Sequence, residues 1–361
     1  MTLASALSEG RLAARDEADA LEELHRLGCT DGLPVVIPTP ERVARMVAAT
    51  CLDADLVLGN MGPGFGSCTI EKLAIAAVMA GCLPEVVPVV LAATRAVLDP
   101  TFDLTEMQAT THCTAPLIII NGPARELCGG IASGVGALGP GHRANATIGR
   151  ALRLAMINIG GGRAGISDMA LLGHPGKFTF CLAENEEESP FTPLHVGRGF
   201  ERDQSVATVV GAEPPHSVMG VTDANDPTSA DRLLTSLALA LANVGANNAS
   251  LRGGAAVVVL NPEHAAVLGA AGHTRASVAQ VIYERAANSG ATLARTAAFP
   301  VGDATRELQC FASPDDVLLM VAGGSGLYSA VMPSWCAGPH RNRAVSVPID
   351  VAPVCEIPGR A

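Results

Sequence analysis

Runs of branched apolar residues alternate along this chain with longer runs rich in alanine and leucine, and this alternation limits the possible folds more than any other feature. Apolar runs without a polar residue at every second position are typical of strands that are covered on both faces. The chain therefore predicts an α/β fold with mixed, mostly parallel sheets. The predicted strands cover residues 33–39, 116–122, 177–184, 205–213, 255–261 and 316–323.

The predicted helices fill the intervals between these strands. They lie near residues 10–27, 40–50, 69–81, 86–98, 145–159, 228–246, 262–270 and 276–289. With 361 residues, of which 48% are hydrophobic and 16% charged, the chain can bury a large core. This length favours two domains or one large duplicated domain.

Two distant segments share one pattern, which predicts an internal duplication. The segments VVIPTPERVARMVAAT (35–50) and VVVLNPEHAAVLGAAG (257–272) each contain a valine-rich strand followed by a helix start. Thr39 and Asn261 would be the N-caps, with proline at the next position. The alternative is that a strand, a cap and a proline are simply a common way to begin any helix.

A second pair of segments, 117–122 and 318–326, gives apolar strands that both end at glycine. We therefore expect two related α/β halves, with a ligand cleft between them. The expected parts are an N-terminal helical segment (1–30), a first half (31–213) and a second half (214–361), with a linker near 211–217.

The charge of the chain excludes one class of partner. The formal net charge is -11 and aromatic residues make up only 3% of the chain, whereas a nucleic-acid surface needs basic patches and stacking aromatic rings. We therefore expect a small-molecule partner and no nucleic acid.

The sequence also predicts a cytoplasmic location without membrane contact. The first residues are charged and contain no apolar segment of the secretory type. The most apolar helical stretch, residues 233–246, is too short to span a bilayer.

The ten cysteines follow no metal-binding or redox spacing. There is no C-x-x-C pair and no zinc-finger pattern, so we expect reduced thiols and no structural metal. Neither a P-loop nor the full dinucleotide fingerprint occurs, so no cofactor is expected.

The segment GPGFGSCTIEKLA (62–74) contains the strongest candidate nucleophile. Its glycines allow a ligand to approach the backbone, and a helix is predicted to start at residues 67–69. Cys68 would lie in the first turn, where the helix dipole favours the thiolate. The amides around it, at Gly66, Ser67 and Thr69, would hold a substrate anion. The alternative is an anion-binding loop in which the cysteine is incidental.

Three further residues are candidates for proton transfer. His112 precedes a predicted buried strand in ATTHCTAP, and Lys177 and Glu184 flank the strand 177–184. The acidic run after that strand is either solvated or directed into a site. His174, Glu184 and Glu186 form an alternative metal-ligand set.

Other polar residues next to glycine-rich turns are candidates for substrate binding. Arg143 and Asn145 are predicted near the start of a helix, where positive charge and dipole suit a carboxylate or phosphate. The turn after the last predicted strand adds four more candidates, Gly323, Gly324, Ser325 and Gly326.

Several segments together resemble a poorly characterised bacterial family associated with proteins that carry the UGSC (selenocysteine-Gly-Ser-Cys) motif. They are DGLPVVIPTPERV, EKLAIAAVMAGCLPEVVPVVLAA, LGHPGKFTFCLAENEE, NPEHAAVLGAAG and MVAGGSGLYSAVMPSW. FGSCT (65–69) is similar to the motif itself, with Phe65 in place of the redox residue and Cys68 as the last cysteine. The resemblance implies a family and a UGSC-type protein partner, but no reaction.

These observations predict an enzyme that acts on a small anionic, carboxylate-bearing metabolite. Cys68 would attack an electrophilic carbon while His112 or Glu184 moves the proton. Lyase, hydrolase and group-transfer reactions fit equally. The alternatives are a thiol or selenoprotein-linked redox enzyme and a non-catalytic anion-binding protein, and the chain could also form a homo-oligomer.

Overall fold

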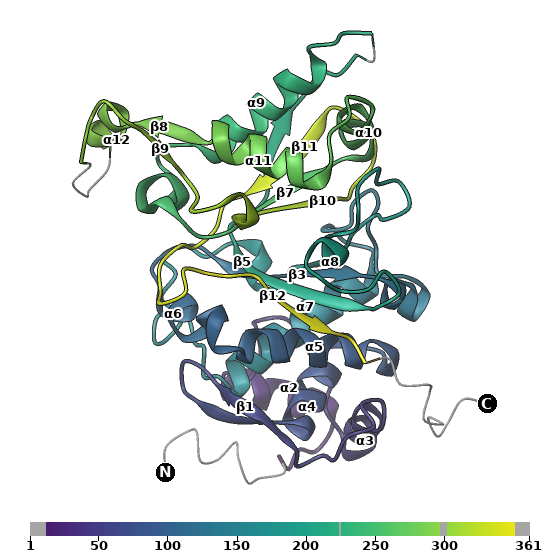
Figure 1. Cartoon of the computed structure of the whole chain (residues 1–361). Helices are drawn as coiled ribbons and strands as arrows, with labels where there is room; N and C mark the ends of the chain where they lie inside the picture. The colour runs from purple at the N-terminus through teal and green to yellow at the C-terminus, as the bar shows by residue number, and fades with distance from the viewer. Residues whose placement is uncertain (1–11, 224, 297–301, 351–361) are drawn as a thin grey trace.

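The structure is a computed structural model, and it describes residues 12–223, 225–296 and 302–350. Two four-stranded sheets form its centre (Figure 1). The first sheet has the order β12-β5-β3-β4, with strands Val345–Pro348, Val206–Ala212, Ala115–Asn121 and Cys181–Ala183. The second has the order β10-β7-β11-β6, with strands Val317–Val321, Ala256–Leu260, Tyr328–Met332 and His216–Met219.

Eight helices lie where the sequence predicts them. They are α2 (Glu17–Arg26), α3 (Pro40–Ala48), α4 (Ile70–Ala80), α5 (Val87–Leu98), α7 (Arg143–Asn158), α9 (Ser229–Leu241), α10 (Pro262–Ala270) and α11 (Arg275–Arg285). The predicted caps are also confirmed, because Thr39 and Asn261 accept hydrogen bonds from the amides three residues later. None of the helices in the described ranges is both long and apolar enough to span a bilayer.

Several shorter elements were not predicted. They are the hairpin β1 (Val57–Met61) and β2 (Gly66–Thr69), the pair β8 (Ala287–Ser289) and β9 (Glu307–Gln309), and the helices α6 (Leu104–Ala109), α8 (Leu194–Gly197) and α12 (Gly290–Thr296). Strands β6, β11 and β12 of the central sheets were missed as well, because they are short and carry polar residues.

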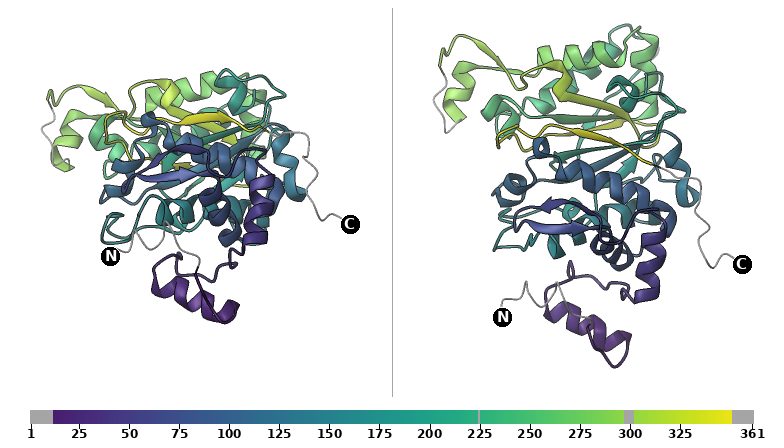
Figure 2. Two further views of the ribbon diagram at one scale, coloured as in Figure 1. Left: turned by 90° about the horizontal axis from the view of Figure 1, so that it is seen from below. Right: turned by 60° about the horizontal axis from the view of Figure 1, so that its bottom comes forward.

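The two sheets pack face to face between two layers of helices. In Figure 1, α9, α10 and α11 cover the second sheet, and α5 and α7 cover the first. The hairpin β1–β2 and helices α3 and α4 lie beyond α5 and α7, while Figure 2 shows α2 at the edge of the molecule, apart from both sheets. The predicted α/β class is therefore confirmed.

This arrangement explains the uninterrupted apolar strands. In β3, Leu117 and Ile119 face the space between the two sheets, whereas Ile118 and Ile120 pack under the helices of the first half. All four side chains are fully buried. A strand that has a second sheet on one face and helices on the other offers no face to water.

When the boundary between the halves is placed after β6, and not at residue 213 as predicted, each sheet is completed by a strand from the other half of the chain. Strand β6 follows β5 directly but pairs with β11 in the second sheet. Strand β12 follows β11 but pairs with β5 in the first sheet. The predicted linker at 211–217 is thus the crossing from β5 to β6, and with the boundary after β6 each half contributes its last strand to the other sheet.

Two predictions about the strands are wrong. The sheets are mixed but not mostly parallel, because only β3–β4 and β7–β10 run parallel among the described strand pairs. Residues 33–39 form an extended segment outside any sheet. Pro34 and Pro38 lack the amide hydrogens that a sheet ladder requires. The proposed match between 35–50 and 257–272 therefore extends to the helix start but not to a common strand.

Candidate functional site

Two groups of polar side chains lie at opposite ends of β3. The amino-end site consists of Gln108, His112, Cys113, Arg153, Asp168, His174, Lys177 and Glu213. The carboxyl-end cluster consists of Asn121, Arg125, Glu184, Glu186, His195 and Arg275. About 20 Å of strand separates the two groups, because β3 has seven residues and each adds about 3.3 Å.

The structure overturns the prediction for Cys68. The residue lies in strand β2, before helix α4 begins, and its side chain is 0% exposed within the apolar core of the first half. Burial raises the pKa of the Cys68 thiol to about 11, and Lys72 only partly opposes this shift. The expected dipole-stabilised thiolate is therefore wrong, because a desolvated sulfur holds its proton.

The glycines before Cys68 serve packing. Gly64 donates its amide to the carbonyl of Gly160 at 2.7 Å. A Cβ atom at Gly66 would lie 2.1 Å from the carbonyl oxygen of Ile159. Ser67 and Cys68 pair with β1, and Thr69 caps α4 through its side chain. These residues make close backbone contacts within the protein, which corrects the expected anion cradle.

In the amino-end site, two cations share one carboxylate. The Lys177 ammonium lies 2.7 Å from both carboxylate oxygens of Asp168, and Arg153 donates to Asp168 at 3.4 Å and to Gln108 at 3.3 Å. Burial lowers the pKa of Lys177, whereas its hydrogen bond to Asp168 acts in the opposite direction. Burial also lowers the pKa of Arg153. The three groups together carry one net positive charge.

His112 forms a dyad with Glu213 at the same end of β3. Its Nε2 atom lies 2.9 Å from a carboxylate oxygen of Glu213, and both side chains are about three-quarters buried. The Nδ1 atom is buried and has no hydrogen-bond partner within the described residues. A carboxylate that accepts the Nε2 hydrogen leaves Nδ1 as the proton acceptor of the ring.

His174 lies beside this dyad, but its contacts serve to hold the local structure. Its Nδ1 atom accepts the amide of Gly176 at 3.1 Å, and its ring meets Phe180 edge to face at 5.6 Å. Burial, followed by the charge of Lys177, lowers the pKa of His174 to about 4. The ring is therefore neutral at physiological pH.

Cys113 supplies a thiol to the amino-end site. Cys113 is half-buried, whereas Cys29, Cys68, Cys181, Cys310 and Cys336 are buried. Cys113 also interacts electrostatically with Lys177. In contrast to the expectation that all ten cysteines are reduced, Cys51 is disulfide-bonded. Cys113 is thus the thiol that lies among titratable groups and near solvent.

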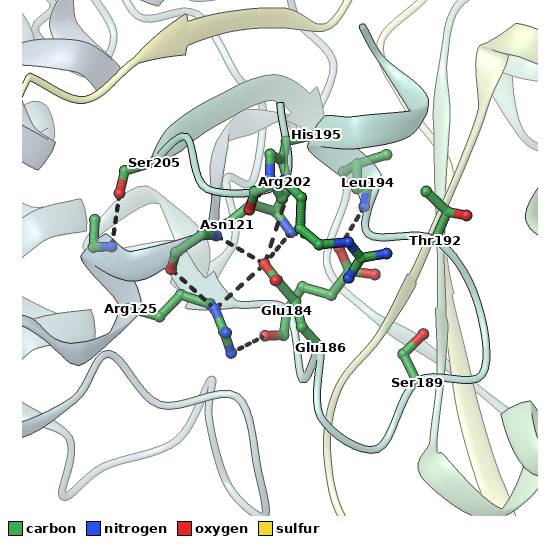
Figure 3. Close-up of polar contacts among 12 residues, drawn as sticks. Asn121, Arg125, Glu184, Glu186, Ser189, Thr192, Leu194, His195, Arg202 and Ser205 are labelled. Atoms are coloured by element: carbon green, nitrogen blue, oxygen red, sulfur yellow. Dashed lines mark hydrogen bonds and ion pairs between the residues drawn. The ribbon is translucent and has the colours of Figure 1, made fainter. Parts of the chain in front are cut away.

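The carboxyl-end cluster is built around Glu184, which is 0% exposed (Figure 3). One of its oxygens accepts from Asn121 at 2.6 Å and from the amide of Leu194 at 2.7 Å. The other oxygen pairs with Arg275 at 2.6 Å. Because Arg275 begins α11, this buried ion pair joins the two halves of the chain. Glu184 is therefore held in a structural network and not directed at His112 or Lys177.

The alternative metal set is not assembled. Glu186 accepts from Asn121 and from the amide of Gly122 at 3.0 and 2.8 Å, next to Arg125 (Figure 3). His174 lies at the other end of β3 from Glu184 and Glu186. Within the described residues, no three histidine, cysteine or carboxylate side chains form a group that could hold a metal.

The remaining binding candidates make internal contacts. Arg143 donates to the carbonyl of Gly81, and the Asn145 amide bonds the backbone of Ala132 in both directions. Gly323 donates its amide to Ser133, and the carbonyl of Gly326 accepts from Asn261. The Gly323–Gly326 turn lies after β10 in the second sheet and does not meet His112 or Lys177.

The sequence analysis found part of the amino-end site. It selected His112, Lys177 and His174 but missed Asp168, Arg153 and Glu213 as members. Asp168 follows no motif, and Glu213 lies in the segment interpreted as a linker. The amides of Met169 and Leu171, which donate to Gln108 and Thr111, bring Asp168 to this site. The pairing of β5 with β3 brings Glu213 to it.

Comparisons with known proteins add no further information on the site. No protein-family model matches the sequence, and no match was found among curated proteins or solved structures. The resemblance to the UGSC-associated family therefore stays a prediction.

Proposed function

We propose that the chain is an enzyme that acts on a small carboxylate-bearing metabolite, with Cys113 as its nucleophile. The observation that carries this proposal is the meeting of a half-buried free thiol, the His112–Glu213 dyad and Lys177 at the amino end of β3. Cys113 thus takes the role that the sequence suggested for Cys68. The ammonium of Lys177 and the guanidinium of Arg153, which share the carboxylate of Asp168, supply positive charge for an anionic substrate.

In the proposed reaction, Glu213 orients His112 and the free Nδ1 atom accepts the thiol proton. The sulfur of Cys113 then forms a bond to an electrophilic carbon of the substrate, and the electron pair displaced from that carbon moves to its oxygen or to the leaving group. His112 returns the proton to the leaving group. Lyase, hydrolase and group-transfer outcomes share this first step.

We also propose that the two halves arose by duplication of one unit. Both sheets place a parallel strand pair next to two antiparallel neighbours, and each half gives its last strand to the other sheet. Strands β3 and β7 correspond, with Asn121 and Asn261 at their carboxyl ends. A cytoplasmic location, a homo-oligomer and a UGSC-type partner remain proposals on sequence grounds.

Alkylation with two reagents of different charge tests the proposed function. Iodoacetate carries a carboxylate and iodoacetamide is neutral, and peptide mass spectrometry assigns the modified cysteine. We expect Cys113 to be modified first, with a ratio of iodoacetate to iodoacetamide rates higher than in the urea-unfolded chain. Lys177→Met should lower that ratio about five- to tenfold, because one nearby positive charge is removed.

Lys72→Met provides the matched control. Lys72 donates to the carbonyl of Ser67, next to the buried Cys68, and lies outside the amino-end site. Its removal should leave the rate ratio at Cys113 unchanged. The proposal is wrong if Cys113 reacts with neither reagent in the folded protein, or if its rate ratio equals that of the unfolded chain.

A further inference from the structure

A pocket with a volume of about 330 Å³ lies in the second half of the molecule. It is formed where β9, α11 and the segment 248–252 meet the loop that contains residue 341. Arg252, Arg306 and Arg341 line it, together with Tyr283, Gln309 and Glu307. None of these residues belongs to the amino-end site, so the pocket is separate from the proposed enzyme activity.

The guanidinium groups of these three arginines are not neutralised by ion pairs within the described residues, as is also the case for Arg143, Arg163 and Arg198. Within the described residues, Arg252, Arg306 and Arg341 make no ion pair, whereas arginines such as Arg150 and Arg275 bind carboxylates at 2.6–2.7 Å. The chain has 35 acidic and 24 basic residues, so partners are abundant. Glu307 is the only carboxylate among the lining residues, which leaves an excess of two positive charges.

The backbone at two of these arginines is unusual as well. Arg252 and Arg341 have φ angles of +54° and +58°, in the left-handed region that favours glycine. Residues other than glycine keep this left-handed conformation only when the surrounding structure stabilises it. Such residues are concentrated at ligand sites. Both arginines therefore line the same pocket from backbone positions in the left-handed region, Arg252 at the end of the helical segment Asn248–Arg252 and Arg341 in a loop.

The lining also suits the organic part of a ligand. Leu251, Leu308 and the buried ring of Phe311 provide apolar wall, and Tyr283 and Gln309 supply neutral polar groups. Guanidinium groups bind phosphate and carboxylate oxygens in pairs, with fixed geometry. A volume of about 330 Å³ is within the range of small-molecule sites.

We infer that this pocket binds a small organic polyanion that carries phosphate groups or several carboxylates. Three arginines and one glutamate among the lining residues leave a positive charge that a ligand with more than one negative charge would balance. Pyrophosphate represents the phosphate class, and citrate represents the polycarboxylate class.

Isothermal titration calorimetry of the full chain at low salt tests this inference. We expect pyrophosphate or citrate to bind, and the ligand that binds more tightly identifies the class. The variant Arg252→Gln, Arg306→Gln, Arg341→Gln should weaken binding about tenfold or more, because charge-assisted hydrogen bonds are lost. The matched control is Arg15→Gln, Arg26→Gln, Arg232→Gln, which removes three exposed charges outside the pocket and should change affinity less than about twofold.

Circular dichroism of each variant shows whether the fold is kept. If the triple pocket variant unfolds, Arg306→Gln alone, at an exposed residue next to β9, replaces it with an expected loss of about threefold or more. The inference is wrong if neither pyrophosphate nor citrate binds the wild-type chain at millimolar concentration. It is also wrong if the pocket variants and the control variant lose affinity equally.

Discussion

The reactivity of a cysteine depends on what surrounds its sulfur, and Cys68 and Cys113 differ in this respect. Cys68 follows a glycine-rich loop, which in many proteins precedes an exposed helix start. Here the loop packs on residues 159–162, and the short strand β2 directs the sulfur into the core. Cys113 follows no motif, but it lies beside Lys177 at the surface end of a buried strand.

Serine substitutions distinguish the two cysteines by stability. Cys68→Ser places a hydroxyl in an apolar core and should reduce the free energy of unfolding by about 1–3 kcal/mol. Cys113→Ser should change it by less than about 0.5 kcal/mol, because the side chain is half-buried near solvent. Urea unfolding monitored by circular dichroism measures both values. Equal losses for the two variants would contradict the different positions of the two sulfurs.

His174 should make the stability depend on pH. Its pKa is about 4 in the folded chain against 6.5 as the ordinary value, so the unfolded state binds more protons between these limits. The contribution of His174 to the free energy of unfolding is therefore fully present above pH 6.5 and is lost as the pH falls toward 4. A single proton gives a slope of at most about 1.4 kcal/mol per pH unit.

His174→Asn isolates this contribution, because the asparagine oxygen can accept the amide of Gly176 without titrating. Urea unfolding between pH 4 and 7 should show a steeper loss for the wild type than for the variant. The exposed His216 provides the control, since His216→Asn should leave the slope of the wild type intact. Identical slopes for the wild type and His174→Asn would refute the buried, neutral ring.

At the scale of elements, the sequence predicted long and strongly patterned segments but not the short ones. Helices with proline after a capping residue were placed within a few residues, because their signals are local. Strands β6 and β12 have only four residues each and belong to sheets built mainly from the other half. Their pairing depends on contacts more than 100 residues away in sequence, which local patterns do not encode. The same holds for Glu213, which reaches His112 across the first sheet.

Strand β12 should depend on one partly buried hydroxyl, that of Ser346. Ser346 accepts from the Arg198 guanidinium at 2.6 Å and bonds the buried Thr208 hydroxyl at 2.8 Å. Ser346→Ala leaves both partners unsatisfied and should cost about 1–3 kcal/mol of stability. Hydrogen exchange of the amides of residues 345–347 should become faster as a result.

The exposed Ser217 in β6 is the matched position on the other exchanged strand. Ser217→Ala should cost less than about 0.5 kcal/mol and leave exchange in β6 unchanged, because this side chain makes no hydrogen bond within the described residues. If Ser346→Ala is equally neutral, the Arg198–Ser346–Thr208 contacts do not hold β12.

At the scale of the whole molecule, the exchanged strands and one buried ion pair join the two halves. The lone tryptophan, Trp335, belongs to the second half by sequence but packs into the helical core of the first half. Neither sheet is complete without the other half of the chain. We therefore expect a single cooperative unfolding transition, although the chain exceeds the usual size for two-state unfolding.

The buried pair of Glu184 and Arg275 provides the sharpest test of this coupling. Glu184→Gln leaves the Arg275 charge without its partner and should cost about 3–5 kcal/mol. Glu187→Gln, which removes the exposed partner of Arg125, should cost about 1 kcal/mol or less. In Glu184→Gln, the unfolding midpoints reported by Trp335 fluorescence and by hydrogen exchange of β7 and β10 should both move to lower denaturant concentration by the same amount. The reason is that the ion pair joins both halves. Separate transitions of the two probes in the wild type would mean that the halves fold independently despite their exchanged strands.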